Sequence, residues 1–327
     1  MPAPEASPKP LVCCSRPLPG DFDVPGTIVR FGPERGFPER EARDAFIRGA
    51  SACVTWVSDK VDAEFLNAAG PALKIVSNFA VGFDNIDLAA CRAAGVAVSN
   101  TPDAVTEGTA DVAFMLMLAA ARKAAGADAF IRSGRWEKHG ILGPNEWIGM
   151  PLAGRTLLIV GAGRIGLATA MRSIGWGMKV LYVANSQKPG FEHAPLNAQR
   201  VGLDEGLCRA DFISVHVPLS PATRHLIDRR RIGLMKPSAV LVNTARGPLI
   251  DEAALAEALA EGRLFAAGLD VFEAEPRVHE RLKSLDNVVL TPHYGSASEA
   301  SRGQMSALCA ANIRAVLAGG KPVTPVG

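Results

Sequence analysis

The chain has 327 residues, of which 48% are hydrophobic and 21% charged, and this balance is typical of a globular protein with room for two domains. The 35 basic and 33 acidic residues leave a formal net charge of +2, so we expect neither nucleic acid nor a membrane surface as the main partner. The longest apolar run, Val112 to Ala121, is far shorter than the ~20 residues of a membrane-spanning helix.

The cysteines and the N-terminus indicate the compartment. The six cysteines show no CxxC pair and no histidine partner at zinc spacing, so we predict reduced, mostly buried thiols and no metal site. Cys13 and Cys14 are adjacent on a predicted strand, where one of them would face a core. The opening "MPAPEASPKP" lacks the apolar segment of a signal peptide, and the protein is predicted to be cytoplasmic.

Short β-branched and aliphatic runs in the first third predict strands of a small α/β domain. These runs are "LVCCS", "TIVRFG", "ACVTWVS", "LKIVSN" and "GVAVSN". The following stretch, "TPDAVTEGTADVAFMLMLAAARK", predicts a buried helix that begins after Pro102 and ends at Arg122 and Lys123. Residues 124–153, with Trp136 and Trp147, read as an irregular segment that contacts a partner.

From residue 154 onward, strand-like runs alternate with helix-like segments, which is typical of a parallel sheet with crossover helices. The runs are "RTLLIV", "MKVLYV", "DFISVHV", "AVLVNT", "LFAAGLDV" and "NVVLTP". Within this part, the run Arg229 to Arg231 is most simply an exposed helix face. The tail after Pro292 returns to a helix that we expect to pack on the first domain.

The predicted fold class is therefore α/β, with two Rossmann-like or flavodoxin-like parallel-sheet domains. The cofactor domain, residues 101–294, is inserted in a substrate domain formed by residues 1–100 and 295–327.

Gly161, Gly163 and Gly166 follow a hydrophobic strand and open a helix, which is the pattern of a dinucleotide-binding turn. The first glycine permits a tight turn, the second lets a pyrophosphate approach the backbone, and the third lets the helix pack on the strand. The helix N-terminus then offers N–H groups and a positive dipole end to the phosphates.

No acid closes the second strand, where NAD-binding proteins hold the adenosine ribose. Ala184 stands there instead, so nothing repels a 2′-phosphate. The residues that follow carry hydrogen-bond donors and one positive charge: Asn185, Ser186, Gln187 and Lys188. We predict a preference for NADPH; the alternative is that the loop binds NADH without its acid.

Reactive residues follow three of the predicted strands, at the edge where ligands bind in open α/β sheets. Arg246 follows "AVLVNT", Glu273 and Glu275 follow "GLDV", and His293 follows "NVVLTP". These residue types fit the reduction of a carbonyl next to a carboxylate. His293 would donate a proton, Glu275 would orient the imidazole and favour its charged form, and Arg246 would hold the carboxylate and polarise the carbonyl.

Several long motifs resemble the D-isomer-specific 2-hydroxyacid dehydrogenases, most closely the glyoxylate and hydroxypyruvate reductases. They run in the right order from about residue 52 to 318: "AVGFDNIDL", "GRTLLIVGAGRIG", "LMKPSAVLVNTARGPLIDEAAL", "AAGLDVFEAEP" and "TPHYGSAS". The resemblance implies that Arg246, Glu275 and His293 are catalytic. Backbone N–H groups at Val81 and Gly82 would bind the substrate carboxylate.

The resemblance also implies further contacts. Cofactor contacts are expected at Thr109, Gly161, Gly163, Arg164, Ile165, Gly166, Val217, Pro218, Thr244, Asp270 and Gly295. Homodimers would form through residues 124–153, and Trp136 would reach the substrate of the partner subunit. Asn78 and Phe79 precede the carboxylate loop where relatives vary, and Tyr294 replaces the usual aliphatic residue beside the histidine.

The predicted function is an NADPH-preferring reductase of small 2-oxo acids, glyoxylate or hydroxypyruvate, to D-2-hydroxy acids. One alternative is a reductase of a larger 2-oxo acid such as a 2-ketoaldonate or phenylpyruvate. A second, from another class, is a dinucleotide-sensing co-repressor that shares this fold.

Overall fold

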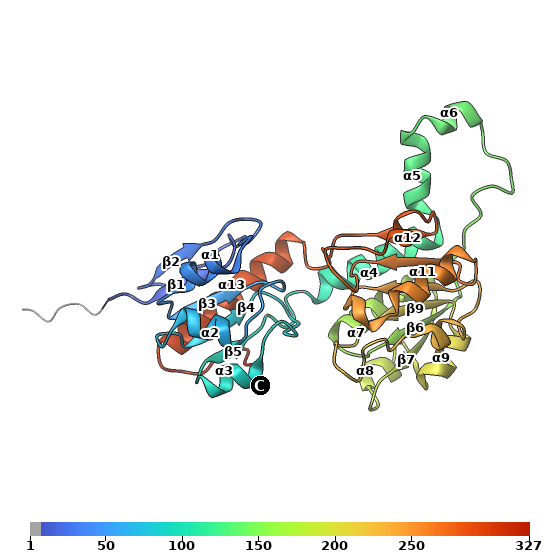
Figure 1. Cartoon of the computed structure of the whole chain (residues 1–327). Helices are drawn as coiled ribbons and strands as arrows, with labels where there is room; N and C mark the ends of the chain where they lie inside the picture. Colours follow the sequence, from blue (N-terminus) through green and yellow to red (C-terminus); the bar gives the residue numbers. More distant parts are fainter. Residues whose placement is uncertain (1–7) are drawn as a thin grey trace, which may run out of the picture. The chain divides into compact units, whose positions relative to one another are not determined.

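A computed structural model describes residues 8–327 and divides them into two compact units (Figure 1). The first unit contains the described residues up to Val105 together with Ser296–Gly327, and the second contains Thr106–Gly295. Most of the stretch searched for a targeting signal lies outside the described residues. Among residues 8–327, no helix combines the length and apolar composition needed to cross a membrane.

The first unit is built on a five-stranded parallel sheet, in the order β2-β1-β3-β4-β5. The strands are β1 (Leu11–Cys14), β2 (Ile28–Phe31), β3 (Ala52–Thr55), β4 (Ile75–Asn78) and β5 (Ala97–Ser99), each within a predicted run. The helices are α1 (Arg40–Ile47), α2 (Ala63–Ala69), α3 (Leu88–Ala93) and α13 (Glu299–Leu317). The C-terminal helix α13 packs on β4 and β5, as predicted for the tail.

The six cysteines are free, and of these only Cys208 is exposed, which confirms the prediction of mostly buried thiols. Cys13 and Cys14 are both buried, although only one was expected to face a core. The reason is that a parallel sheet is covered on both faces, so alternate side chains on a strand are buried alike. Burial raises the pKa of Cys13 and of Cys91 to about 11, so these thiols stay protonated and unreactive at neutral pH.

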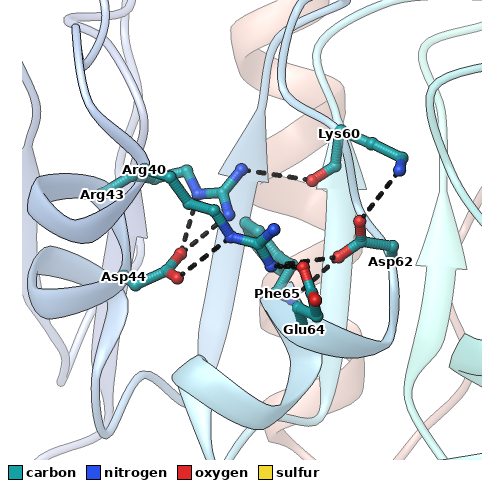
Figure 2. A network of polar contacts seen from close by, with 7 residues as sticks. All are labelled: Arg40, Arg43, Asp44, Lys60, Asp62, Glu64 and Phe65. Atoms are coloured by element: carbon teal, nitrogen blue, oxygen red, sulfur yellow. Dashed lines mark hydrogen bonds and ion pairs between the residues drawn. The ribbon is translucent and has the colours of Figure 1, made fainter.

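A network of charged side chains joins α1 to the start of α2 (Figure 2). Asp62 is the N-cap of α2: its carboxylate accepts a hydrogen bond of 3.0 Å from the Phe65 N–H and lies 3.2 Å from Lys60 Nζ. Arg40 pairs with Glu64 on the neighbouring turn. The hydrogen bond from the Phe65 N–H lowers the pKa of Asp62. Burial acts in the opposite direction, but the nearby charges of Lys60 and Arg40 lower the pKa further.

We expect Asp62→Ala to lower the free energy of unfolding by about 1 kcal/mol at neutral pH, because an orphan helix N–H loses its acceptor. Urea denaturation measures the change, with Glu64→Ala as the control. That control removes only the exposed ion pair with Arg40, which solvent screens, so it should change the free energy of unfolding less than Asp62→Ala does. Since the pKa of Asp62 is lowered on folding, its contribution is complete above pH 3.8 and is lost as the pH falls through the folded-state value. An Asp62→Ala protein as stable as the parent would contradict the assignment.

The second unit is built on a seven-stranded parallel sheet, in the order β12-β11-β10-β9-β6-β7-β8. Six strands lie within the predicted runs: β6 (Thr156–Val160), β7 (Lys179–Val183), β9 (Phe212–Val215), β10 (Val240–Asn243), β11 (Ala266–Leu269) and β12 (Val288–Leu290). The seventh, β8 (Gln199–Arg200), is an unpredicted two-residue edge strand beside β7.

Crossover helices connect these strands. They are α7 (Arg164–Arg172), α8 (Pro189–Glu192), α9 (Leu203–Arg209), α10 (Arg229–Ile232), α11 (Glu252–Ala260) and α12 (Glu280–Lys283), with one-turn 3-10 helices at Ile174–Trp176 and Gly247–Leu249. The arginines of α10 lie on its outer face and pair with carboxylates of Asp204 and Glu257, as expected of an exposed helix face.

The predicted apolar helix is α4 (Thr106–Ala121), and its burial is confirmed. It packs on β10, β11 and α7, with Leu116 and Met117 completely buried. Gly268 on β11 packs directly against α4. A Cβ on Gly268 would lie only 2.8 Å from Leu116 Cβ. This close contact places the start of α4 beside the strand ends that carry the candidate site.

Residues 124–153 differ from the predicted irregular segment. They contain two helices, α5 (Ala124–Arg132) and α6 (Arg135–His139), which project from the sheet of the second unit (Figure 1). Neither helix contains a buried residue. The segment instead exposes large hydrophobic side chains: Ile131, Trp136, Ile141, Leu142 and Ile148.

Candidate active site and dinucleotide site

The glycine loop between β6 and α7 has the geometry of a dinucleotide-binding turn. Gly161 has a φ of +104°, and a Cβ there would lie 2.7 Å from the His216 carbonyl group. A Cβ on Gly166 would collide with the Gly161 carbonyl, so only glycine lets α7 approach β6 this closely. A Cβ on Gly163 would meet open space, and no side chain caps the helix at this residue. The loop therefore leaves room for a pyrophosphate at a helix N-terminus.

Other predicted cofactor residues line the same edge of the sheet. Val217 and Pro218 follow β9, and the backbone of Val217 lies next to Gly161. Arg164 and Ile165 form the first turn of α7. Thr244 follows β10, and its Oγ1 is buried with no hydrogen-bond partner among the described residues. Because a buried hydroxyl without a partner is costly, this atom fits a site that a polar ligand completes.

Thr109, Asp270 and Gly295 are brought together on three different elements. A Cβ on Gly295 would lie 3.1 Å from Asp270 Oδ2 and 3.4 Å from the Thr109 methyl group. Asp270 is completely buried, and its carboxylate accepts hydrogen bonds from the backbone N–H groups of Tyr294 (3.0 Å) and Gly295 (2.9 Å). The Thr291 hydroxyl donates a third, at 2.7 Å. Asp270 therefore fixes the backbone on both sides of His293.

His293 and Glu275 form the candidate catalytic pair. Imidazole Nδ1 lies 2.8 Å from Glu275 Oε2, and Oε1 of the same carboxylate accepts a hydrogen bond from the Phe272 N–H at 3.0 Å. His293 has a φ of +51°, a left-handed conformation that is costly for this residue and that the Asp270 hydrogen bonds hold in place.

The charge of the pair follows from its surroundings. Burial opposes ionisation of Glu275, but the His293 hydrogen bond and charge, the Phe272 N–H and the charge of Arg246 outweigh it and lower the pKa of Glu275. The carboxylate is therefore ionised at neutral pH. It can orient the imidazole through Nδ1, while Nε2 makes no hydrogen bond to the described residues.

Arg246 is presented by a turn at the end of β10. The buried Asn243 side chain donates a hydrogen bond to the Arg246 carbonyl (2.9 Å) and accepts one from the Ala245 N–H (3.0 Å). A Cβ on Gly247 would collide with the Phe272 carbonyl group, so this turn packs tightly against the segment that carries Glu275.

The neighbouring acids and histidines are already engaged. Glu273, the other candidate carboxylate, pairs with His225 at 2.7 Å and with Arg224 at 2.9 Å. His216 Nε2 lies 2.8 Å from the Ser214 hydroxyl, and burial lowers the pKa of His216 to about 3, so it is neutral at neutral pH. His216 is therefore unsuited to donate a proton at neutral pH, and His293, with Nδ1 bonded to Glu275, is the candidate.

Glu252, at the start of α11, is hydrogen-bonded to the backbone of the segment that carries Glu275. Its buried carboxylate accepts hydrogen bonds from the backbone N–H groups of Glu273 (2.6 Å) and His279 (2.8 Å). Glu252 is not among the predicted site residues, because an acid at the start of a predicted helix is not by itself a sign of a functional site.

In the first unit, the loop after β4 offers free N–H groups. The carbonyl of Val81 accepts a hydrogen bond from the Asn100 side chain, and that of Gly82 accepts one from the Asn78 side chain, each at 2.7 Å. Among the described residues, the N–H groups of Val81 and Gly82 donate no hydrogen bond. With its carbonyls fixed from behind, the loop is suited to bind a carboxylate through these N–H groups.

A cavity of about 520 Å³ opens at the carboxyl ends of β1, β3 and β4 in the first unit. The guanidinium of Arg302 lies over the ring of Trp56, 4.5 Å from its centre, and faces Phe79 at 5.9 Å. Burial lowers the pKa of Arg302, and no carboxylate within residues 8–327 pairs with it. The cavity therefore presents a partly desolvated cation beside aromatic rings.

Two other residues singled out in the sequence lie at the surface. Trp136 is 44% exposed on α6, and within the described chain no ring contact or hydrogen bond joins it to His293. The Tyr294 hydroxyl contacts Met115 Sδ on α4 at 3.3 Å. The proposed contact of Trp136 with substrate in a partner subunit stays a prediction.

The segment predicted to distinguish NADPH from NADH lies at the end of β7. Asn185, Ser186 and Gln187 are exposed, and the Lys188 N–H donates a hydrogen bond of 3.1 Å to the Tyr182 hydroxyl. Arg200 of β8, which the sequence analysis missed, donates hydrogen bonds to the carbonyls of Ala184 and Asn185, each at 3.0 Å.

A parallel sheet with a dinucleotide loop and a histidine–carboxylate pair at its strand ends defines an oxidoreductase that uses a nicotinamide dinucleotide. The family model described as the D-isomer-specific 2-hydroxyacid dehydrogenase NAD-binding domain matches residues 114–295. The chain belongs to this family, which confirms the resemblance and the predicted fold class and identifies an NAD(P)-dependent oxidoreductase.

Individual relatives agree with this assignment. A glyoxylate reductase from Thermococcus onnurineus is 49% identical over 281 residues, which cover 86% of this chain and 84% of the relative. A solved structure from Thermus thermophilus is 39% identical, with a TM-score of 0.89 over 97% of this chain and 100% of that one. An NADPH-dependent glyoxylate/hydroxypyruvate reductase from Sinorhizobium meliloti, solved with NADP and malonate, is 32% identical, with a TM-score of 0.81 over 98% of this chain and 97% of that one.

Proposed function

We propose that the protein reduces small 2-oxo acids, glyoxylate or hydroxypyruvate, to D-2-hydroxy acids with NADPH. The observation that carries this proposal is the His293–Glu275 hydrogen bond of 2.8 Å, beside the Arg246 turn and in the same unit as the glycine loop. The names of the Thermococcus onnurineus and Sinorhizobium meliloti relatives support the substrate class.

The proposed reaction needs a hydride and a proton. A bound NADPH supplies the hydride to the carbonyl carbon, and negative charge develops on the carbonyl oxygen. His293 donates its proton from Nε2 to this oxygen, and solvent restores the proton after product release. Glu275, ionised and bonded to Nδ1, stabilises the imidazolium before the transfer and holds the ring in position.

In the second unit, the Arg246 guanidinium holds the substrate carboxylate. In the first unit, the loop with the N–H groups of Val81 and Gly82 is by itself suited to bind a carboxylate. A planar guanidinium matches a carboxylate with two parallel hydrogen bonds, and it also polarises the adjacent carbonyl. Asn78 and Asn100 act as positioning residues, because they fix the carbonyls of the same loop.

For the cofactor, the proposed preference for NADPH follows from Ala184, which stands where an acid would repel a 2′-phosphate. The cofactor named for the Sinorhizobium meliloti relative, NADP, supports it.

We expect Ala184→Asp to shift the preference toward NADH, because the new carboxylate accepts from the ribose 2′-hydroxyl and repels the phosphate. The ratio of kcat/KM for NADPH to kcat/KM for NADH should fall by about 10-fold or more, since a lost charged contact is worth about 1.5–3 kcal/mol. Ala184→Ser is the matched control, with a side chain of similar size and no charge. An unchanged ratio in Ala184→Asp would count against the proposed cofactor.

The cavity around Arg302 and Trp56 favours a second candidate, a larger and more polar 2-oxo acid such as a 2-ketoaldonate. Its volume exceeds what glyoxylate needs, and Arg302 has donors for hydroxyl or carboxylate groups. Comparing kcat/KM for glyoxylate, hydroxypyruvate, phenylpyruvate and 2-ketogluconate with NADPH separates the candidates. A value for 2-ketogluconate above that for hydroxypyruvate would replace the first proposal by the second.

We also propose a homodimer formed through residues 124–153, where α5 and α6 expose large hydrophobic side chains. Exposed apolar patches of this kind mark interaction surfaces. A co-repressor that senses dinucleotides stays the alternative from another class. It would bind NADPH but reduce none of the 2-oxo acids in the same panel.

A further inference from the structure

We infer that Arg200 binds the 2′-phosphate of NADPH and so determines the cofactor preference. This inference rests on the proposed use of NADPH and goes further, because it assigns the phosphate contact to a residue outside the loop that follows β7.

The position of Arg200 follows from strand pairing. β8 pairs in parallel with β7, with Arg200 opposite Tyr182, two residues before Ala184. The side chain runs along the edge of the sheet to the carboxyl end of β7, where Nε donates to the Ala184 carbonyl and Nη2 to the Asn185 carbonyl. The adenosine ribose of a dinucleotide lies at this strand end. The guanidinium therefore lies next to the backbone of Ala184, the residue that stands where the usual acid is missing.

The hydrogen bonds of Arg200 fix the guanidinium without neutralising it. They use Nε and one proton of Nη2, and the remaining protons of Nη1 and Nη2 stay available. Both acceptors are carbonyls, and no carboxylate in the described part of the chain pairs with Arg200. By contrast, Arg209 on the following helix is paired with Glu205. A fixed guanidinium with free donors suits the geometry of a phosphate group.

The same contacts shape the loop that a phosphate would meet. Arg200 holds the carbonyls of Ala184 and Asn185, while the Tyr182 hydroxyl accepts from the Lys188 N–H and donates to Glu192 at 2.5 Å. Glu192, the acid closest to this loop in the hydrogen-bond network, thus has its carboxylate bonded to Tyr182. The loop is fixed at both ends, with Asn185, Ser186 and Gln187 exposed between them. Little ordering is needed when a phosphate binds, which favours affinity.

The test is equilibrium binding to the full chain, measured by calorimetry with two probes. One probe, 2′,5′-ADP, carries the 2′-phosphate, and the other, 5′-AMP, lacks it. We expect Arg200→Gln to weaken 2′,5′-ADP binding by about 10-fold to 100-fold, the usual effect of losing a charged hydrogen-bond donor. Binding of 5′-AMP should change less than about 2-fold, which also shows that the variant is folded.

Two further variants sharpen the test. Lys179→Gln removes a positive charge from the opposite end of β7 and should leave the binding of both probes unchanged. Arg200→Lys keeps the charge but loses the planar fork, and its affinity for 2′,5′-ADP should lie between those of the parent and Arg200→Gln.

The outcomes separate this inference from the proposed function. If the parent protein binds 2′,5′-ADP no more tightly than 5′-AMP, both the NADPH preference and the role of Arg200 are wrong. If the parent discriminates and Arg200→Gln discriminates equally well, the inference alone is overturned. A loss of 2′,5′-ADP binding confined to Lys188→Gln would then assign the phosphate to the loop lysine.

Discussion

His293→Ala is expected to lower kcat by about 10²-fold to 10⁴-fold while the protein still binds NADPH, because a positioned general acid contributes this much to proton transfer. The proton must reach the carbonyl oxygen as the hydride arrives, and water at the vacated position is a weaker and less oriented acid. Stopped-flow or steady-state absorbance of the reduced nicotinamide gives kcat, and quenching of intrinsic fluorescence gives cofactor affinity.

The matched control for His293→Ala is His225→Ala. His225 also has a positive φ and pairs with a glutamate at short distance, 2.7 Å from Glu273. It lies in the segment between β9 and α10 and takes no part in the proposed reaction. Its replacement should leave kcat within about 3-fold of the parent. Equal losses in both variants would mean that His293 acts through stability, and near-normal turnover of His293→Ala would exclude it as the acid.

Arg246→Ala has the second largest expected effect, a loss of about 10²-fold to 10³-fold in kcat/KM, comparable to removing a donor that stabilises developing negative charge. The loss should appear in both KM and kcat, because the guanidinium is proposed to bind the carboxylate and to polarise the carbonyl. Arg246→Lys retains the charge but not the two parallel donors, so it should recover only part of the activity.

Arg224→Ala controls for the loss of an arginine at the same edge of the sheet. Arg224 pairs with Glu273 and belongs to no proposed contact with substrate, so kcat/KM should stay close to the parent value. Full activity of Arg246→Lys would show that charge alone is needed and would contradict the role of the planar fork.

The strands and the positions of the three candidate catalytic residues were predictable because both depend on local patterns. Runs such as "AVLVNT" and "NVVLTP" are apolar, short and end at polar residues, and parallel strands bring those ends to one edge. The structure places His293 and Glu275 in direct contact as a result. We predict the imidazole contact for Glu275 rather than Glu273, and in the structure Glu275 makes it while Glu273 pairs with His225.

The residues that were missed act through long-range contacts. Glu252 on α11 accepts from the backbone N–H groups of Glu273 and His279, more than 20 positions away, and Arg200 reaches a loop 15 and 16 positions earlier. A two-residue strand such as β8 has no periodicity to detect. The double burial of Cys13 and Cys14 likewise depends on helices that cover both faces of the sheet.

The segment 124–153 was predicted as irregular because its glycines and exposed aromatic residues broke any apolar period. The structure forms α5 and α6 there without burying a residue in either helix, so neither helix has an apolar face packed on a core. An exposed helix of this kind has no core pattern from which it could be predicted.

The most direct test of the central claim is the initial rate of reduction of glyoxylate and hydroxypyruvate by the native protein, with NADPH and NADH at the same ionic strength. We predict that NADPH is oxidised only when a 2-oxo acid is present, with kcat/KM for the 2-oxo acid of at least about 10⁴ M⁻¹s⁻¹. The kcat/KM for NADPH should be at least about 10-fold above that for NADH. Cofactor binding without oxidation by either 2-oxo acid, or a preference for NADH, would contradict the proposed function.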